Sequence, residues 1–143
     1  MGGMDAHLEG GFVLDDDRRR IDAKAVHAFL TTSYWARGRD RALIDELIAT
    51  ASRVVGLYAP DGSQVGFTRT VSDGRTISYL ADVYVLEEFR GRGLGVELVR
   101  FTVDGGTLAQ TKWLLHTRDM HRLYEKVGFA TPDGRAMERW PAR

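Results

Sequence analysis

Residues 83–95 read Val83-Tyr84-Val85-Leu86-Glu87-Glu88-Phe89-Arg90-Gly91-Arg92-Gly93-Leu94-Gly95. An apolar run typical of a strand is followed by a charged, glycine-rich turn and then by the start of a helical pattern. Glycine allows positive φ angles and lets the backbone approach a ligand closely. The first amides of a helix have no partners within it and, together with the helix dipole, favour an anion such as phosphate. Arg90 and Arg92 would add charge-assisted hydrogen bonds to that anion.

Three kinds of phosphate-binding loop compete for this segment. A Walker A loop ends in Gly-Lys-Ser or Gly-Lys-Thr, which this loop lacks. A dinucleotide fingerprint reads Gly-x-Gly-x-x-Gly within repeated βαβ units, whereas this chain has Gly91-x-Gly93-x-Gly95 and one crossover. The pyrophosphate loop of acyl-CoA enzymes uses Arg-x-x-Gly-x-Gly, and Arg90-Gly91-Arg92-Gly93-Leu94-Gly95 has that spacing. We favour this third alternative.

The surrounding pattern predicts a single α/β domain over residues 12–143, with a flexible tail over residues 1–11. Its mixed, mainly antiparallel sheet has helices on both faces and one right-handed βαβ crossover. Asp22 is the expected N-cap of the first helix, Asp119 that of the last, and Gly128 its C-cap. The expected helices cover residues 22–35, 40–51, 95–103 and the segment between Asp119 and Gly128. The expected strands cover residues 54–58, 64–71, 76–85, 113–116 and 136–140.

On this loop and its surroundings the chain resembles the GCN5-related N-acetyltransferases, the GNAT family. The long strand Tyr79–Val85 precedes the loop, and Leu123-Tyr124-Glu125-Lys126-Val127-Gly128-Phe129 follows further on, as in the family's second motif. The resemblance covers about residues 22–140. A subgroup without a substrate known to us also carries Tyr-Trp-Ala-x-Gly-Arg and Asp-Val-Tyr-Val, which here are residues 34–39 and 82–85.

The resemblance implies an enzyme in which an amine attacks the thioester of acetyl-CoA directly. The backbone of Val83 and Val85 would pair with the pantetheine arm, and the Val85 amide would hold the acetyl carbonyl and its developing oxyanion. Tyr124 would donate a proton to the departing thiolate. The implied acetyl-CoA-binding residues are Val83, Tyr84, Val85, Arg90, Gly91, Arg92, Gly93, Leu94, Gly95 and Tyr124.

The residue that takes the proton from the amine is left open. Asp82, beside the acetyl-binding strand end, is one catalytic candidate, as a base acting through water or in substrate binding. Diamine acetyltransferases have Tyr-Leu-Glu-Asp at this place, but this chain reads Tyr79-Leu80-Ala81-Asp82, so the glutamate proposed as their proton acceptor is missing. His116 is a second candidate base through water. For both residues a purely structural role is the alternative.

The loop between the first two helices is the expected wall of the acceptor site. Tyr34 and Trp35 are suited to stacking on a cation or covering an apolar stem. Arg37 and Arg39 have the chemistry to hold a carboxylate or a phosphate. The acceptor we expect is therefore an amine of a small molecule or a protein, and this mixture of side chains fits one that also carries an anionic group.

Composition narrows the remaining alternatives. Among 143 residues, 20 basic and 20 acidic side chains balance to a net charge of zero, and there is no cysteine. Balanced charge argues against nucleic acid as a partner, and the lack of cysteine excludes thiolate catalysis and cysteine zinc sites. We expect no metal, no membrane contact and a cytoplasmic location, while a homodimer is neither required nor excluded. The alternative function is a non-catalytic, regulatory acetyl-CoA-binding module, which the alanine at position 81 leaves open.

Overall fold

The computed structural model describes residues 3–142 and places six strands in one sheet, in the order β1-β2-β3-β4-β5-β6. All neighbouring strands run antiparallel except β5 and β6, which are parallel. This confirms the predicted mixed, mainly antiparallel sheet with one crossover. The strands are β1 (Asp5–His7), β2 (Val13–Asp15), β3 (Arg53–Tyr58), β4 (Gln64–Ser72), β5 (Ile77–Val85) and β6 (Lys112–Leu115).

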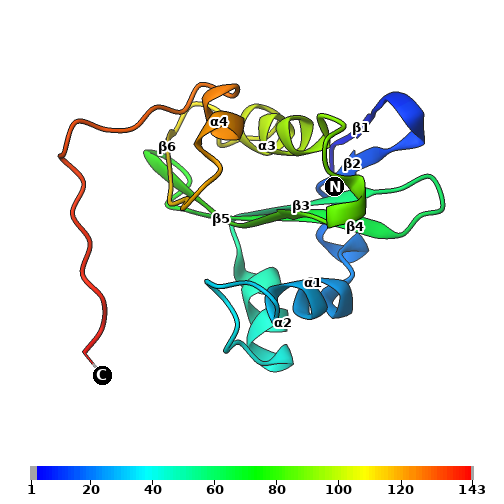
Figure 1. Cartoon of the computed structure of the whole chain (residues 1–143), viewed down its shortest axis with the longest axis horizontal. Helices are drawn as coiled ribbons and strands as arrows, with labels where there is room; N and C mark the ends of the chain where they lie inside the picture. The colour runs from blue at the N-terminus through cyan, green and yellow to red at the C-terminus, as the bar shows by residue number, and fades with distance from the viewer. Residues whose placement is uncertain (1–2, 143) are drawn as a thin grey trace.

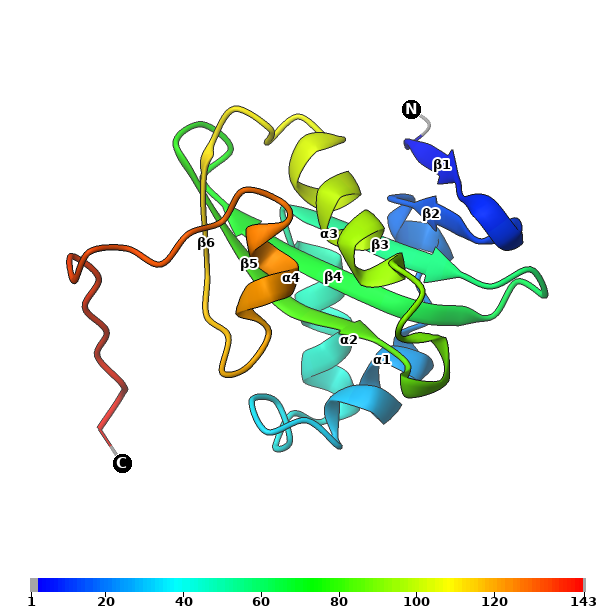
Figure 2. The ribbon, with the colours of Figure 1, turned by 45° about the horizontal axis from the view of Figure 1, so that its top comes forward.

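Helices cover both faces of the sheet, as predicted (Figure 1). The helices are α1 (Ala23–Leu30), α2 (Arg41–Thr50), α3 (Leu94–Asp104) and α4 (His121–Glu125). On one face, α1 and α2 bury an apolar cluster with Phe67 and Tyr84 of the sheet. On the other face, Leu80 packs against Val99 and Val103 of α3, with α4 alongside (Figure 2). The long strand β5 thus contributes side chains to the apolar clusters on both faces of the sheet.

Local capping chemistry explains where the outer helices begin. The Asp22 carboxylate accepts a hydrogen bond of 3.0 Å from the Ala25 amide, so the predicted N-cap of α1 is confirmed. The prediction for α4 was wrong, because Asp119 makes no capping hydrogen bond. Instead the amide of Met120, the residue at the N-cap, donates to the Thr117 hydroxyl over 3.0 Å. A threonine three residues before the N-cap position therefore orders this turn.

The two ends of the chain differ from the sequence-based expectation. Residues 1–11 are not simply a tail, because β1 pairs with β2 from Asp5↔Asp15 to His7↔Val13; residues 1 and 2 lie outside the described part. The strand expected over residues 136–140 is absent, and residues 130–142 form no helix or strand. The ribbon of this segment runs away from the sheet (Figure 1) and Met137 is 97% exposed, although the Glu138 carboxylate lies 3.3 Å from the His116 ring. No sheet edge therefore pairs with it.

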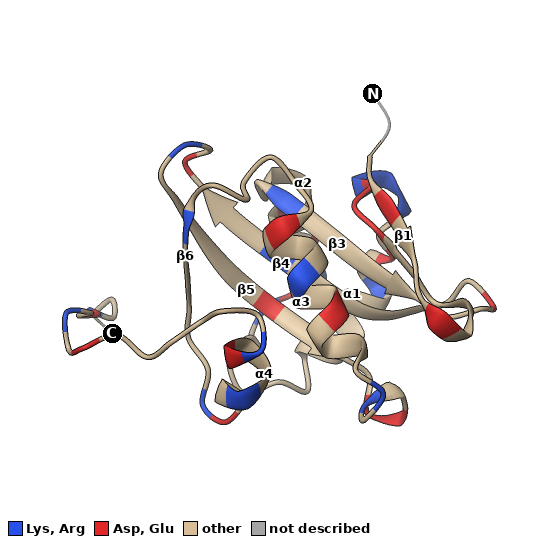
Figure 3. Cartoon of the chain, turned by 90° about the horizontal axis from the view of Figure 1, so that it is seen from above, with Lys and Arg blue, Asp and Glu red and all other residues tan. Residues whose placement is uncertain are grey.

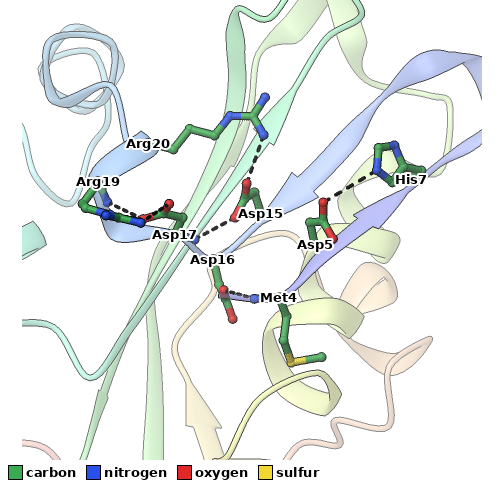
Figure 4. Close-up of polar contacts among 8 residues, drawn as sticks. All are labelled: Met4, Asp5, His7, Asp15, Asp16, Asp17, Arg19 and Arg20. Carbon is green, nitrogen blue, oxygen red and sulfur yellow. Dashed lines mark hydrogen bonds and ion pairs between the residues drawn. The ribbon is translucent and has the colours of Figure 1, made fainter. Parts of the chain in front are cut away.

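A run of three aspartates and three arginines, residues 15–20, ties the first two strands together (Figure 4). The Asp16 carboxylate accepts from the Met4 amide at the start of β1, and Asp15 accepts from Arg20 over 3.0 Å. Arg18 turns the other way and donates to the main-chain carbonyl of Ala51 at the end of α2, over 2.8 Å. Residues of this charged run therefore form specific hydrogen bonds that connect β1, β2 and the end of α2.

Charge is sparse within the central sheet. Most lysine, arginine, aspartate and glutamate residues lie in helices and loops, while strands β3 to β5 are largely free of them (Figure 3). Among residues 3–142, no helix is long and apolar enough to span a bilayer. The few charges that do enter the sheet therefore need partners.

Arg53 of β3 is one of these charges, and its guanidinium joins three segments. It donates to the Thr102 carbonyl over 3.0 Å and to the Phe101 carbonyl over 3.1 Å, at the end of α3. It also pairs with the Asp16 carboxylate over 2.5 Å, and both side chains are about nine-tenths buried. Arg53 thereby couples the N-terminal strands to the helix that follows the glycine loop.

We predict that Arg53→Met destabilises the fold by about 3 kcal/mol, because it leaves Asp16 buried without a counter-ion. Urea unfolding followed by circular dichroism measures the change. The matched control is Arg100→Met on α3, whose pair with Glu97 is exposed and should change stability by less than about 1 kcal/mol. Equal effects of the two substitutions would contradict the coupling role of Arg53.

Candidate acyl-CoA and acceptor site

The two parallel strands of the sheet pair over only part of their length. The register runs from Ile77↔Lys112 to Leu80↔Leu115, where β6 ends. β5 continues for residues 81–85, and the chain after β6 turns away from it (Figure 2). Within the described residues, this half of β5 has β4 on one side and no strand on the other.

A β-bulge marks the place where the strands separate. Phe67 of β4 faces Tyr84, and Arg69 faces Ala81. The two residues Asp82 and Val83 therefore lie opposite the single residue Thr68. Asp82 has a φ angle of +54°, and it is the only non-glycine residue with a positive φ in the described chain. A side chain in this left-handed region is strained, so surrounding contacts must hold it there.

The Asp82 carboxylate receives those contacts from two arginines and a tryptophan. Its Oδ2 atom accepts from Arg39 over 2.8 Å and from Arg69 over 2.7 Å, and its Oδ1 atom accepts from the Trp35 indole over 2.9 Å. Asp82 is only 5% exposed. Arg39, expected to face a substrate anion, instead pairs with this residue. The Tyr-Trp-Ala-x-Gly-Arg and Asp-Val-Tyr-Val motifs thus meet in space.

We predict that Asp82→Asn destabilises the protein by about 3 kcal/mol, because two partly buried guanidinium groups lose their shared counter-ion. Amide hydrogen exchange should become faster over residues 34–39, which lose their anchor to β5. Asp45→Asn is the control, because the Asp45–Arg41 pair on α2 is half exposed. Unchanged exchange in the loop of the Asp82 variant would contradict the anchoring role.

The alternation of ladder hydrogen bonds orients the backbone at the end of β5. The Leu86 amide donates to the Val65 carbonyl over 2.8 Å, so in an antiparallel pair Tyr84 also faces β4. The polar groups of Val85 then point to the opposite, unpaired side. There the Arg90 Nε donates to the Val85 carbonyl over 2.8 Å. The Val85 amide remains on that side as a donor.

The side chains of residues 83–85 serve the core rather than the open edge. Val83 packs with the cluster under α3, and Tyr84 stacks on Phe29 of α1 with ring centroids 4.0 Å apart. Burial raises the pKa of Tyr84 to about 12. Any contact that this segment makes with a ligand at the open edge is therefore a main-chain contact.

The glycine loop presents a row of unpaired amides. After the short 3-10 helix Glu87–Phe89, Gly91 and Gly93 adopt φ angles of +79° and +78°, and α3 begins at Leu94. Among the described contacts, no backbone hydrogen bond starts from residues 91–96, and the first helical bond is donated by Glu97 to Gly93. Open space adjoins Gly91 and Gly93, where an added Cβ atom would touch nothing. This arrangement fits an anion of the size of a diphosphate.

Two arginines flank the loop in different ways. Arg90 is tied to the Val85 carbonyl, as described, and so reaches back toward β5. The Arg92 guanidinium lies over the Phe89 ring, 5.5 Å from its centroid, and remains exposed. Both arginines expected beside a phosphate are exposed, and they differ in that Arg90 is bound to the main chain of β5.

Tyr124 lies on α4 and packs against the apolar cluster of Leu80, Val99 and Val103. The helix ends in a Schellman arrangement, in which the Phe129 amide donates to the Tyr124 carbonyl over 3.1 Å and Gly128 has a φ angle of +95°. This confirms the predicted terminating glycine. Burial, with a smaller contribution from nearby Tyr34, raises the pKa of Tyr124 to about 12. Its hydroxyl therefore keeps its proton at any ordinary pH.

A hollow of about 550 Å³ lies beside the end of β5. Its lining residues come from the end of α1, the segment before α2, and the segments after β5 and β6. Tyr34, Trp35 and Arg37, the predicted acceptor residues, all line it. The Arg118 guanidinium stacks on the Tyr34 ring at 3.9 Å. Its lining residues are Phe29, Thr32, Ser33, Tyr34, Trp35, Arg37, Glu87, Arg90 and Arg118.

Glu87 and Arg118 were not predicted as part of the acceptor site. Glu87 lies in the short 3-10 helix after β5 and Arg118 in the loop after β6, and no local spacing links either residue to residues 34–37. His116, the second candidate base, contacts Tyr79 and Glu138 through its two ring nitrogens, over 2.5 Å and 3.3 Å. Within residues 3–142, no cluster of three or more His, Asp or Glu residues is arranged to hold a metal ion.

Comparison with known proteins agrees with this geometry. Residues 51–131, more than half of the chain, match the family described as the acetyltransferase (GNAT) domain. The crystal structure of a GNAT-family protein from Xanthomonas campestris pv. campestris is 31% identical, with a TM-score of 0.84, over 95% of this chain and 96% of that one. A Gibberella zeae protein with a provisional acetyltransferase name is 28% identical over 83% of this chain and 79% of its own length.

A more distant structure shares the fold alone. Arabidopsis thaliana glucosamine-6-phosphate N-acetyltransferase is 17% identical, with a TM-score of 0.61, over 99% of this chain and 100% of that one. The family match and the similar solved structure together define an acyltransferase. The chain belongs to the GNAT family of acetyltransferases, which use acetyl-CoA as cosubstrate.

Proposed function

We propose that this chain is an N-acetyltransferase that passes the acetyl group of acetyl-CoA, by direct attack, to a primary amine of a small molecule or a protein. The observation that carries the proposal is the row of unpaired amides over residues 91–96, at the end of the unpaired half of β5. These amides are suited to donate hydrogen bonds to the coenzyme's diphosphate. Family membership favours turnover over the alternative, a non-catalytic acetyl-CoA-binding module.

The end of β5 supplies the donors for the pantetheine arm and the acetyl group. Val83 and Val85 would pair with the arm through main-chain groups, as an added strand does. The Val85 carbonyl already accepts from Arg90, so the Val85 amide is the group left to hold the acetyl oxygen and the charge that develops on it. The open edge of β5 supports this assignment.

Tyr124 is the proposed acid for the departing thiolate. Because burial raises its pKa to about 12, Tyr124 carries its proton when the carbon–sulfur bond breaks. A coenzyme thiolate, whose thiol has a pKa of about 8.5, needs only modest help as a leaving group. The proximity of Tyr34 to Tyr124 supports a shared location for this acid and the acceptor hollow.

Asp82, predicted as a catalytic residue, is better suited to positioning. Its carboxylate already accepts from Arg39, Arg69 and Trp35, and it is buried. His116, the other candidate base, also has both ring nitrogens in contact with neighbours. We therefore assign proton removal from the amine to solvent before attack, so that the neutral amine is the form that reacts.

We predict that Tyr124→Phe lowers kcat by roughly 10²-fold and leaves the KM for acetyl-CoA within about twofold, because general acids act in the chemical step. Thiol release from acetyl-CoA with a panel of primary amines is the assay. Tyr58→Phe, which also removes a buried hydroxyl, is the control and should retain full turnover. Unchanged kcat in the Tyr124 variant would remove the acid role, and no thiol release by the wild-type chain would contradict the function.

The pH dependence tests the assignment of the proton steps. An alkyl ammonium has a pKa of about 10.4. Below that pH, the fraction of neutral amine therefore rises about tenfold for each unit by which the pH increases. Because Tyr124 stays protonated to about pH 12, kcat/KM for the amine should rise steadily from pH 6 to 9.5 without an alkaline decline. A plateau above pH 7 would instead reveal a protein base.

A further inference from the structure

We propose that the acceptor hollow binds a small amine that also carries an anionic group, a carboxylate or a phosphate. This inference rests on the proposed acetyl transfer and specifies the acceptor of the same site. The hollow's lining includes three arginines, Arg37, Arg90 and Arg118, against one carboxylate, Glu87. A hollow with this charge attracts anions and disfavours acceptors with several positive charges, such as diamines.

Unlike Arg39 and Arg69, the arginines that line the hollow have no carboxylate partner within the described part of the chain. Arg39 and Arg69, at the adjoining bulge, share the Asp82 carboxylate and are satisfied. By contrast, among residues 3–142, no carboxylate pairs with Arg37, Arg90 or Arg118. All three line the same hollow, where a bound anion would compensate them.

Two of these arginines are held in place by other contacts. The Nε of Arg90 donates to the Val85 carbonyl, which leaves the terminal nitrogens of its guanidinium as donors. The Arg118 guanidinium stacks on the Tyr34 ring, which leaves its edge for hydrogen bonds. A guanidinium held in this way loses less conformational entropy when it binds a carboxylate or phosphate.

The same hollow also has groups suited to the amine. Glu87 provides a carboxylate for the ammonium form, and the faces of Tyr34 and Trp35 attract a cation. Arg90 lines the hollow and contacts the Val85 carbonyl, so the hollow adjoins the proposed acetyl-binding amide. A volume of about 550 Å³ is in the range of small-molecule sites.

The acceptor class is tested by a panel of short amines matched in length. β-Alanine carries a carboxylate, phosphoethanolamine a phosphate, ethanolamine no charge beyond the amine, and 1,3-diaminopropane a second cation. We expect kcat/KM to be about 10- to 100-fold higher for one of the anionic amines than for ethanolamine, and lowest for the diamine. The better of the two anionic amines identifies the anion. Equal or higher kcat/KM for ethanolamine or the diamine would overturn the inference while leaving acetyl transfer intact.

Two substitutions locate the effect in the hollow. Arg37→Gln and Arg118→Gln should each raise the KM for the preferred anionic amine about tenfold or more, without raising that for ethanolamine or acetyl-CoA. Arg75→Gln, in the exposed turn between β4 and β5, is the control and should change none of these. Equal KM changes for ethanolamine and the anionic amine would contradict anion recognition by these arginines.

A binding experiment without turnover separates this inference from the proposed function. With CoA saturating, inorganic phosphate and acetate are titrated, and thermal unfolding is followed. We expect one of them to raise the Tm of the wild-type chain but not that of the Arg37→Gln/Arg118→Gln variant. No difference between the two proteins would overturn the anion site. A clear difference, with no amine acetylated, would support the anion site and contradict the proposed acetyl transfer.

Discussion

The separation of β5 from β6 after Leu80 is the constraint on which the site depends. A strand of this length in the middle of a sheet would normally be paired on both sides, because unpaired main-chain groups in the interior are costly. Here the bulge at Asp82 turns the strand, and the neighbour ends at Leu115. The left-handed backbone at Asp82 persists because Trp35, Arg39 and Arg69 all donate to its carboxylate.

This one carboxylate connects the coenzyme side and the acceptor side of the molecule. The bulge exposes the main chain of residues 83–85, which precedes the amides of the glycine loop. Two of the three donors that hold the bulge, Trp35 and Arg39, come from the segment carrying Tyr34 and Arg37, which line the acceptor hollow. The position of residues 34–39 and the backbone geometry of β5 therefore depend on the same contacts with Asp82. A change in one is expected to alter the other.

The features predicted well from the sequence are those whose physics is local. The N-cap at Asp22, the terminating glycine Gly128 and the glycine loop each depend on neighbouring residues, and the central strands show in their continuous apolar runs. Strands β1 and β2 were missed because three residues are too few to show a period. The strand expected over residues 136–140 failed because strand formation needs a partner edge, which sequence pattern cannot supply. The partners of Asp82, and the place of Arg118 beside Tyr34, arise only from tertiary contact.

The amides of residues 91–96 must donate hydrogen bonds to the coenzyme's diphosphate if the site binds acetyl-CoA as proposed. Amide NMR shifts of ¹⁵N-labelled protein, followed during a titration with CoA and then with pantetheine, which lacks the diphosphate, measure this. We predict large downfield proton shifts for the amides of residues 91–96 with CoA and small ones with pantetheine, while the exposed turn at residues 73–76 stays unchanged with both. Saturation with CoA that leaves the amides of residues 91–96 unshifted would contradict the account.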